Sequence, residues 1–527
     1  MLQPPSWRME QERKICVFSA LCVSVLTFQK EIMSRNRIIL VTIGIMLSLF
    51  LASMESTVVA TATPTIVGQL GGLQHYSWVF SAFMLASTTT VPLYGKLSDL
   101  YGRRRLYLIA MALFLAGSIL CGLANTMTQL IWARGLQGVG AGGVLPLAFI
   151  LIGEMFSLEQ RAKMQGYFSG VWGVSSIVGP LLGGFLVDQL SWRWVFYINI
   201  IPGLLAASLV AFAWRDQIHS HEKPSVDYAG AGLLTVAVVT LLLGLMDESG
   251  TSLKWILVGA SIVFLIALLW VERRAVDPIL PLHLFRERLF AATIAHGMLS
   301  GGALFGSVSF IPLFVQSVLG TNAMTAGFTI APMLVGWVIA SIIGTRIMLK
   351  VKYRRLAIAG TALLVVGSFL MSRADVESSQ MYLMTCVALM GVGMGLSIPP
   401  FFIAVQSSVE RRYLGVATST MQFSRSMGGT LGVSIMGAAL TARLASNLAT
   451  SNLDPELVSH LLEPASGPGL VINEAARIAL ANAISLVFII AFIAAAFAFL
   501  SVFLAPNKDL MEKPTATEDN PALVSAD

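Results

Sequence analysis

The chain has 527 residues, of which 56% are hydrophobic and only 12% are charged. Charged residues make up about a quarter of an ordinary soluble domain, so this composition argues against a soluble enzyme and predicts a membrane protein. The formal net charge of +6 does not indicate nucleic-acid binding, because the basic residues are spread over short loops between apolar segments. The cysteines have neither paired nor metal-ligand spacing, and they are Cys16, Cys22, Cys121 and Cys386.

The first 32 residues differ from the rest of the sequence. Arg8, Arg13 and Lys14 precede an apolar run over residues 15–28, which has the charge and length of a signal-peptide core but no A-x-A cleavage site after it. The run is also short for a spanning helix. Two interpretations remain open, a peripheral N-terminal helix and an extension upstream of a natural start at Met33, and we favour the extension.

From residue 38 onward, apolar length and turn residues predict fourteen membrane-spanning helices. Each is close to the roughly 20 apolar residues that cross a bilayer as a helix. The predicted helices lie at residues 38–60, 77–95, 106–124, 129–152, 164–187, 194–214, 229–246, 254–271, 289–312, 323–349, 355–372, 380–404, 414–441 and 476–504.

The basic residues predict the orientation of these helices. If the N-terminus is inside, nearly all lysines and arginines fall in loops on the inner side, where the cytoplasmic loops of membrane proteins are enriched in them. The exceptions in the outer loops are Arg193, Lys254, Arg373, Arg443 and Arg477. Both termini are therefore predicted to be cytoplasmic. The sequence contains no N-x-[ST] glycosylation site, and we expect a bacterial inner (cytoplasmic) membrane.

A charged loop separates the second and third predicted helices, with the sequence Gly-Lys-Leu-Ser-Asp-Leu-Tyr-Gly-Arg-Arg-Arg over residues 95–105. Its arginines are unfavourable in hydrocarbon and place the loop at the cytoplasmic surface. Gly95 and Gly102 remove side-chain bulk where a tight corner requires close approach or positive φ. Asp99 is placed to pair with Arg103 and Arg104 or with a helix N-terminus.

Three charged residues are predicted inside apolar helices, where ionisable groups are unfavourable and usually face an internal pathway. They are Glu55, Arg134 and Arg425. A low dielectric favours the neutral form of a carboxyl group, so Glu55 is a candidate for binding and releasing a proton; the alternative is a packing role. Arg134 keeps its proton and needs an acceptor, for which a carboxylate is the natural partner. Arg425 either lies in the interior or extends to the surface from near a helix end.

The fifth predicted helix carries small residues at steps of three or four, which predict a close helix contact and a proline kink. The residues singled out there are Gly170, Gly179, Pro180, Gly183 and Gly184. Glycines over residues 428–437 echo this pattern. Residues 344–355 look like a degenerate copy of the charged loop without its aspartate. Paired features in two halves of a sequence indicate a carrier that is built from repeats.

Together these motifs resemble the fourteen-helix drug:proton antiporter family of the major facilitator superfamily, over about residues 37–506. The segments that carry the resemblance are the charged loop at 95–105, an acidic motif at 55–64, an arginine motif at 134–143, a Gly-Pro motif at 170–184, and landmarks of the fourteen-helix branch at 191–202 and 284–290. One departure is Glu55, where many relatives carry aspartate; the carboxyl chemistry is retained.

The resemblance implies an all-α membrane protein with the major facilitator fold, made of two pseudo-symmetric six-helix bundles and two inserted helices. The expected divisions are a poorly ordered cytoplasmic extension at 1–36, bundles at 37–214 and 289–506, a linker with the inserted helices at 215–288, and a cytoplasmic tail at 507–527. The resemblance also implies a monomer in the bilayer, and an Asp99 that binds residues 415–424 and holds the cytoplasmic side shut.

The resemblance further implies proton-coupled export of lipophilic or cationic drugs and toxic small molecules, with Glu55 and Arg134 in the coupling site. The side chains expected in the substrate cavity are Trp78, Gln137, Trp172, Gln316, Gln406, Gln422 and Arg425. The alternatives are a dedicated exporter of an endogenous antibiotic, siderophore or basic amino acid, and an uptake symporter. The sequence has no phosphate-cradling loop and no metal or nucleophile motif, so we expect neither an enzyme nor a bound cofactor or metal.

Overall fold

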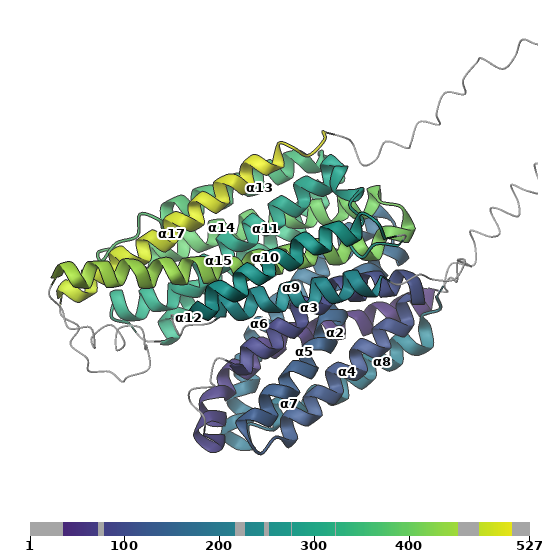
Figure 1. The fold of residues 1–527 in the computed structure, drawn as a ribbon, viewed down its shortest axis with the longest axis horizontal. Helices are drawn as coiled ribbons and strands as arrows, with labels where there is room; N and C mark the ends of the chain where they lie inside the picture. The colour runs from purple at the N-terminus through teal and green to yellow at the C-terminus, as the bar shows by residue number, and fades with distance from the viewer. Residues whose placement is uncertain are drawn as a thin grey trace, which may run out of the picture.

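The computed structural model describes residues 35–71, 78–216, 227–246, 252–275, 277–321, 323–451 and 474–507. The predicted extension up to residue 34 and the tail from residue 508 lie outside the described residues, as do most of the long loop after α15 and part of the linker between the halves. Within the described residues the fold consists of helices (Figure 1).

Seven helical segments form the first half of the protein. They are α2 (Arg35–Leu70), α3 (Trp78–Tyr101), α4 (Arg103–Leu123), α5 (Met127–Met155), α6 (Leu158–Gln189), α7 (Trp194–Tyr197) and α8 (Ile200–Ala213). The short α7 and the longer α8 together occupy the sixth predicted span, which is interrupted at Ile198 and Asn199. This interruption places the Asn199 side chain in the interior.

The remaining helices follow a linker after residue 216. They are α9 (Tyr228–Met246), α10 (Ser252–Glu272), the 3-10 turn η2 (Leu284–Arg286), α11 (Arg288–Leu313), the π-helical turn η3 (Phe314–Val318), α12 (Ala323–Ile347), α13 (Tyr353–Met371), α14 (Gln380–Ser408), the 3-10 turn η4 (Arg411–Tyr413), α15 (Leu414–Ser451) and α17 (Glu474–Val502). All fourteen predicted segments therefore fall on helices.

Twelve helical segments within the described ranges are long and apolar enough to cross a membrane, with α7 and α8 counted as one. The helices α3 and α15 are long as well, with 24 and 38 residues, but they do not meet this criterion. Their apolar runs are interrupted by hydroxyl-bearing and charged residues, such as Thr88 to Thr90 in α3 and Thr418 to Thr420 in α15. The prediction of fourteen spans is therefore not confirmed by apolarity.

The same pattern of helix contacts occurs twice. In the first half α5 packs against α3 and α4, and α2 packs against α6 and α8. In the second half α14 packs in the same way against α12 and α13, and α11 against α15 and α17. The contacts between the halves are paired too, with α3 against α15 and α6 against α12. This repetition indicates a pseudo-twofold relation, which the paired sequence features predicted.

Each half has its own apolar core. Tyr107, Phe114 and Leu147 are among the buried side chains of the first half, and Phe314, Leu364 and Phe488 are among those of the second. In Figure 1 the helices of the first half, in purple and blue, lie to one side of the green and yellow helices of the second half. Segments distant in sequence meet both inside each half and where the two halves face each other.

The helices α9 and α10 pack against each other, and α9 also contacts α3 and α15. Leu234 and Val238 of α9 are buried in a cluster that includes Leu93 of α3 and Met427 of α15. Figure 1 shows α9 and α10 in front of the boundary between the two halves. The helices α9 and α10 therefore lie over the contact between α3 and α15.

Candidate functional site

Glu55 of α2 and Arg134 of α5 form an ion pair in the interior of the first half. Arg134 Nη1 donates to Glu55 Oε1, and each side chain is only 1% exposed. Arg134 also uses Nε to donate to the backbone oxygen of Val79 at the start of α3, over 3.0 Å. A charge this deeply buried is tolerated only when it is paired and hydrogen-bonded. The acceptor that the sequence required for Arg134 is therefore Glu55.

Three neutral side chains complete the hydrogen bonds of the pair. Gln137 Oε1 accepts from Arg134 Nη1 at 2.7 Å, and Asn199 Nδ2 donates to Glu55 Oε2 at 2.8 Å. Ser118 of α4 accepts from Asn199 at 3.0 Å and from Gln137 at 3.3 Å, while it donates to the backbone oxygen of Phe196 at 2.9 Å. Gln137, Asn199 and Ser118 are completely buried. Glu55 thus accepts hydrogen bonds on both oxygens, as an ionised carboxylate does.

Aromatic rings enclose the guanidinium group. The Arg134 Cζ lies 4.3 Å from the ring centre of Phe83 on α3 and 5.9 Å from that of Phe196 on α7. Cation–π contacts of this kind stabilise a cation away from water. Because arginine keeps its charge in proteins, these contacts surround a fixed positive charge.

Sequence reasoning missed Ser118 and Asn199. Asn199 precedes α8, but its side chain makes no capping hydrogen bond to that helix and reaches Glu55 instead. Its only sequence signal was its place in the landmark segment at residues 191–202. Ser118 had no signal, because a serine in an apolar helix usually bonds to its own backbone.

A second cluster lies at the other end of α3, where Asp99 contacts the start of α15. Asp99 Oδ1 accepts from the backbone N–H of Gly415 at 3.1 Å, and Oδ2 accepts from that of Val416 at 2.9 Å. The first N–H groups of a helix are unpaired within the helix and carry partial positive charge, so they bind a carboxylate well. The contact lies within the range 415–424 that the resemblance predicted.

Arg103 extends this contact into a series of charges across the halves. It pairs with Asp99, donates to Ser98 Oγ at 2.9 Å, and lies 3.6 Å from Glu154 of α5. Glu154 also lies 3.6 Å from Arg411, which belongs to the second half. We call Asp99, Arg103, Glu154 and Arg411 the charge network. Sequence reasoning missed Glu154 and Arg411.

Arg104 has a different place from the one predicted. Its backbone N–H donates to Asp216 Oδ1 at 3.1 Å, and Asp216 also accepts from the Trp214 indole at 2.8 Å. Asp216 therefore supplies the acidic group at the start of α4, where a carboxylate is favourable. In the described contacts Asp99 binds Arg103 and α15, not Arg104.

Gly95 and Gly102 have different roles in the charged segment that carries Asp99. A Cβ atom on Gly95 would lie 1.9 Å from Ser419 Oγ and 2.8 Å from the Gly415 oxygen, so only glycine lets α3 approach α15 this closely. Gly102 has φ +95°, which other residues adopt at a cost. The prediction of close approach is confirmed at Gly95, and the prediction of positive φ is confirmed at Gly102.

The Gly-Pro motif of α6 packs against the helix that carries Glu55. A Cβ atom on Gly179 or Gly183 would lie 2.0 Å from Oγ1 of Thr57 or Thr61 on α2. Gly170 and Gly184 have open space instead, and Pro180 is exposed. The motif is thus a helix contact at two of its glycines, and it fixes α6 against α2 near the ion pair.

The side chains predicted for a shared cavity are spread over the molecule. Gln137 belongs to the ion-pair network, whereas Gln406 is buried near the Asp99 end of the helices and donates to the Phe149 oxygen at 3.3 Å. Trp78 starts α3 at the opposite end and is 36% exposed. Trp172 is 40% exposed on α6, and Gln316 is half-buried in η3. The structure does not bring these five together.

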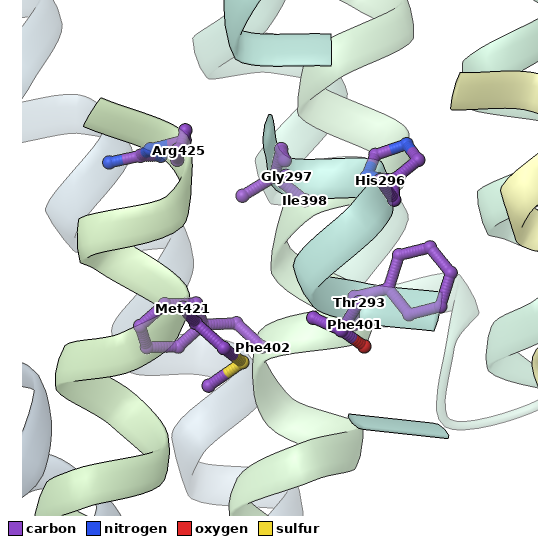
Figure 2. Close-up of a pocket in the computed structure, with 8 residues that line it drawn as sticks. All are labelled: Thr293, His296, Gly297, Ile398, Phe401, Phe402, Met421 and Arg425. Atoms are coloured by element: carbon purple, nitrogen blue, oxygen red, sulfur yellow. The ribbon is translucent and has the colours of Figure 1, made fainter. Parts of the chain in front are cut away.

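Gln422 and Arg425 lie together on α15, where Arg425 Nη2 donates to Gln422 Oε1 at 2.8 Å. Arg425 is half-buried and lines a small pocket of the second half (Figure 2). The pocket is lined by Thr293, His296, Gly297, Ile398, Phe401, Phe402, Met421 and Arg425. Part of the Arg425 side chain borders this pocket, while its guanidinium points away from the other lining residues (Figure 2).

Comparison with known proteins identifies the family. The Major Facilitator Superfamily profile matches residues 45–433, and the chain belongs to this superfamily of transporters. It is 39% identical over 436 residues to the multidrug transporter protein MdtP of Bacillus subtilis (strain 168), covering 82% of this chain and 80% of that protein. It is also 39% identical over 407 residues to multidrug resistance protein 3 of the same organism, covering 76% and 79%.

Solved structures support the fold. The proton:xylose symporter XylE has a TM-score of 0.60 at 13% identity, covering 90% of this chain and 98% of that one. The human organic anion transporter MFSD10 has a TM-score of 0.58 at 14% identity, covering 86% and 99%. At this identity the likeness concerns the fold alone. The superfamily match and the relatives in Bacillus, together with this fold, identify the protein as a multi-pass membrane transporter and not an enzyme.

Replacing Asp99 by asparagine tests the contact with α15. The carboxylate accepts two backbone N–H groups, and hydrogen bonds to a charged group contribute about 1.5–3 kcal/mol each. We expect Asp99→Asn to lower the transport rate at least about tenfold, while the Kd for a transported dye changes less than about twofold. Glu410→Gln is the control, because Glu410 pairs with Arg412 at the exposed surface and such pairs contribute little. A large loss of dye affinity in Asp99→Asn would contradict this assignment.

Enlarging Gly95 tests the close approach of α3 and α15. In Gly95→Val the added carbon atoms overlap Ser419, so we expect the two helices to separate at the Asp99 end. Electron–electron distance measurements between spin labels at Tyr101→Cys and Arg412→Cys should show a longer mean distance than in the parent protein. Gly184→Val is the matched control, since a Cβ there meets no atom within 4 Å. An unchanged distance in Gly95→Val would show that the contact does not require glycine.

Proposed function

We propose that this transporter is a proton-coupled antiporter, which exports lipophilic or cationic drugs and other toxic small molecules across the bacterial cytoplasmic membrane. The buried Glu55–Arg134 pair carries the proposal. Its carboxylate is the acidic member of an ion pair with almost no exposure to water, and ionisable groups in such positions mark proton and substrate pathways in transporters. The relatedness to two Bacillus multidrug proteins supports the substrate class.

The proposed cycle uses competition between a proton and a substrate. With Glu55 ionised, the first half carries a carboxylate that attracts a cationic substrate. Uptake of a proton from outside neutralises Glu55 and removes that attraction, so the substrate leaves outward. Arg134 keeps its charge throughout and favours the ionised form of Glu55, so that the proton is released again on the cytoplasmic side.

The two halves, residues 37–214 and 289–506, are proposed to rock against each other around this site. The charge network would hold the cytoplasmic side shut, because Asp99 of the first half binds the start of α15 in the second half. Opening then requires the carboxylate to leave two N–H groups, and water entering the gap compensates for their loss. Residues 215–288 would link the halves, with α9 and α10 bound over the contact of α3 and α15.

We also propose that α3 and α15 cross the membrane, which gives fourteen spans with both termini in the cytoplasm. The helix α3 packs against α5 and α15, and α15 packs against α11, α17 and α3, so their polar residues can face other helices instead of lipid. Arg443, near the end of α15, would lie outside, and Arg411, just before α15, would lie inside.

Dye transport into membrane vesicles tests the proton coupling. In membrane vesicles with an imposed pH gradient, Glu55→Gln should abolish gradient-driven dye transport, because the amide cannot exchange a proton and still fills the same space. We expect at least about a hundredfold loss of gradient-driven uptake, whereas dye binding persists. The control is Glu410→Gln at the exposed surface, which should transport normally. Undiminished gradient-driven transport by Glu55→Gln would rule out this role for Glu55.

Cysteine labelling tests α15 as a membrane span. In a background lacking Cys16 and Cys22, a membrane-impermeant maleimide should label Arg443→Cys in intact cells. It should label Arg411→Cys only after the cells are permeabilised, since Arg411 precedes α15 and Arg443 lies near its far end. Labelling of both positions from the same side would contradict a membrane-spanning α15.

A further inference from the structure

The Asn199 side chain has an unusual position in the ion-pair network. It is completely buried, and its Nδ2 donates both to Glu55 Oε2 at 2.8 Å and to Ser118 Oγ at 3.0 Å. Its Oδ1 is also buried, yet it accepts no hydrogen bond from any described residue. A buried amide oxygen without a donor is unfavourable. This orientation of the amide therefore leaves one hydrogen-bonding atom of Asn199 unsatisfied.

We propose that Asn199 is a positioning residue that senses the protonation state of Glu55 by reversing its side-chain amide. The inference rests on the proposed proton coupling at Glu55. In the structure the amide presents its NH2 group to the carboxylate, which suits the ionised form. When Glu55 takes up a proton, the amide presents its oxygen instead.

The direction of the change follows from the donors around Glu55. Arg134 has only donors, so the oxygen that faces it, Oε1, cannot carry the proton toward it. The proton therefore resides on Oε2, which now points at Asn199. Two donors would then face each other, the Glu55 O–H and the Asn199 Nδ2–H. Rotation of the amide about its last side-chain bond, which has two broad and nearly equivalent orientations, brings Oδ1 into place to accept.

The reversal reaches the interruption of the sixth span through Ser118. With the amide reversed, Oδ1 also faces the Ser118 hydroxyl, which now donates to the backbone oxygen of Phe196 at the end of α7. The hydroxyl hydrogen can turn from Phe196 to Asn199. The Phe196 oxygen keeps the backbone N–H of Asn199 as a donor at 3.3 Å, but the side-chain hydrogen bond from α4 to α7 is lost.

After the reversal, Nδ2 takes the position that Oδ1 occupies in the structure. At this position the amide has no hydrogen-bond partner among the described residues. An unpartnered buried NH2 group disfavours this conformation of the protein. Protonation of Glu55 is thereby coupled to movement of the segment between α7 and α8, since that movement provides a new acceptor for Nδ2. The unpaired amide oxygen in the structure therefore marks the position that Nδ2 takes after the reversal.

Other groups near Glu55 do not supply the same response. The charged or titratable groups that the described residues place in the network are Arg134 from α5 and the Cys121 thiol from α4, which contacts Gln137 Oε1 at 3.6 Å. The helix α6 meets α2 nearby through Ser175, whose hydroxyl donates to Ser53 at 2.5 Å. Of these groups, only Arg134 is bonded to the carboxylate, and its charge does not change.

Infrared difference spectroscopy of the purified protein in lipid tests the proposal without a transported substrate. A pH titration should show a carboxylic C=O band that is absent in Glu55→Gln. Isotope labelling of asparagine should show an amide carbonyl band that shifts at the same pH midpoint, and this shift should be lost in Asn199→Leu and in Glu55→Gln. If Asn199→Leu does not fold, Asn199→Ala tests the same point.

The midpoint itself gives the second readout. Asn199 donates to the ionised form of Glu55 and, after the reversal, accepts from the protonated form, but the bond to the charged carboxylate is the stronger of the two. We expect the midpoint of the Glu55 band to move about one pH unit upward in Asn199→Leu, which corresponds to the difference between a hydrogen bond to a charged group and one to a neutral group. Ser175→Ala removes a buried hydroxyl beside α2 without contacting Glu55, and its midpoint should equal that of the parent protein.

Two different failures can be told apart. A Glu55 band that titrates in the parent protein, with an unshifted asparagine band and the same midpoint in Asn199→Leu, would overturn the role of Asn199 alone. Absence of any Glu55 band in the parent protein over the accessible pH range would overturn both the proton coupling and the inference drawn from it.

Discussion

The pairing of Glu55 with Arg134 away from water is the interaction on which the rest of this structure depends. Removing one partner of a buried ion pair destabilises a protein by about 3–5 kcal/mol, because the remaining charge has no water to solvate it. Asn199, Ser118 and Gln137 compensate by completing the hydrogen bonds. The proton coupling that we propose depends on this pair.

Two helices connect the ion pair to the Asp99 cluster. The helix α3 supplies the Val79 oxygen to Arg134 at one end and Asp99 to α15 at the other, about 30 Å away at 1.5 Å per residue. The helix α5 likewise carries Arg134 and Glu154. A change at Glu55 that shifts either helix therefore acts on the contact between the two halves.

The sequence predicted those features that depend on local composition. Long apolar runs had to form helices, Arg134 required an acceptor, and Gly95 and Gly102 marked a close approach and a positive φ, all of which the structure shows. Asn199 could not be predicted as a partner of Glu55, 144 residues away, because its role depends on proximity in three dimensions. The arrangement of the predicted cavity residues could not be deduced, because helices that are apolar on nearly every face do not reveal which face points inward.

The most direct test of this account measures protons released by the purified parent protein when it binds a substrate. In weakly buffered solution near neutral pH, addition of the lipophilic cation tetraphenylphosphonium should release protons in proportion to its binding, and Glu55→Gln should bind the cation without releasing any. Proton release that persists unchanged in Glu55→Gln, or cation binding by the parent protein without proton release, would contradict the claim that substrate and proton compete through Glu55.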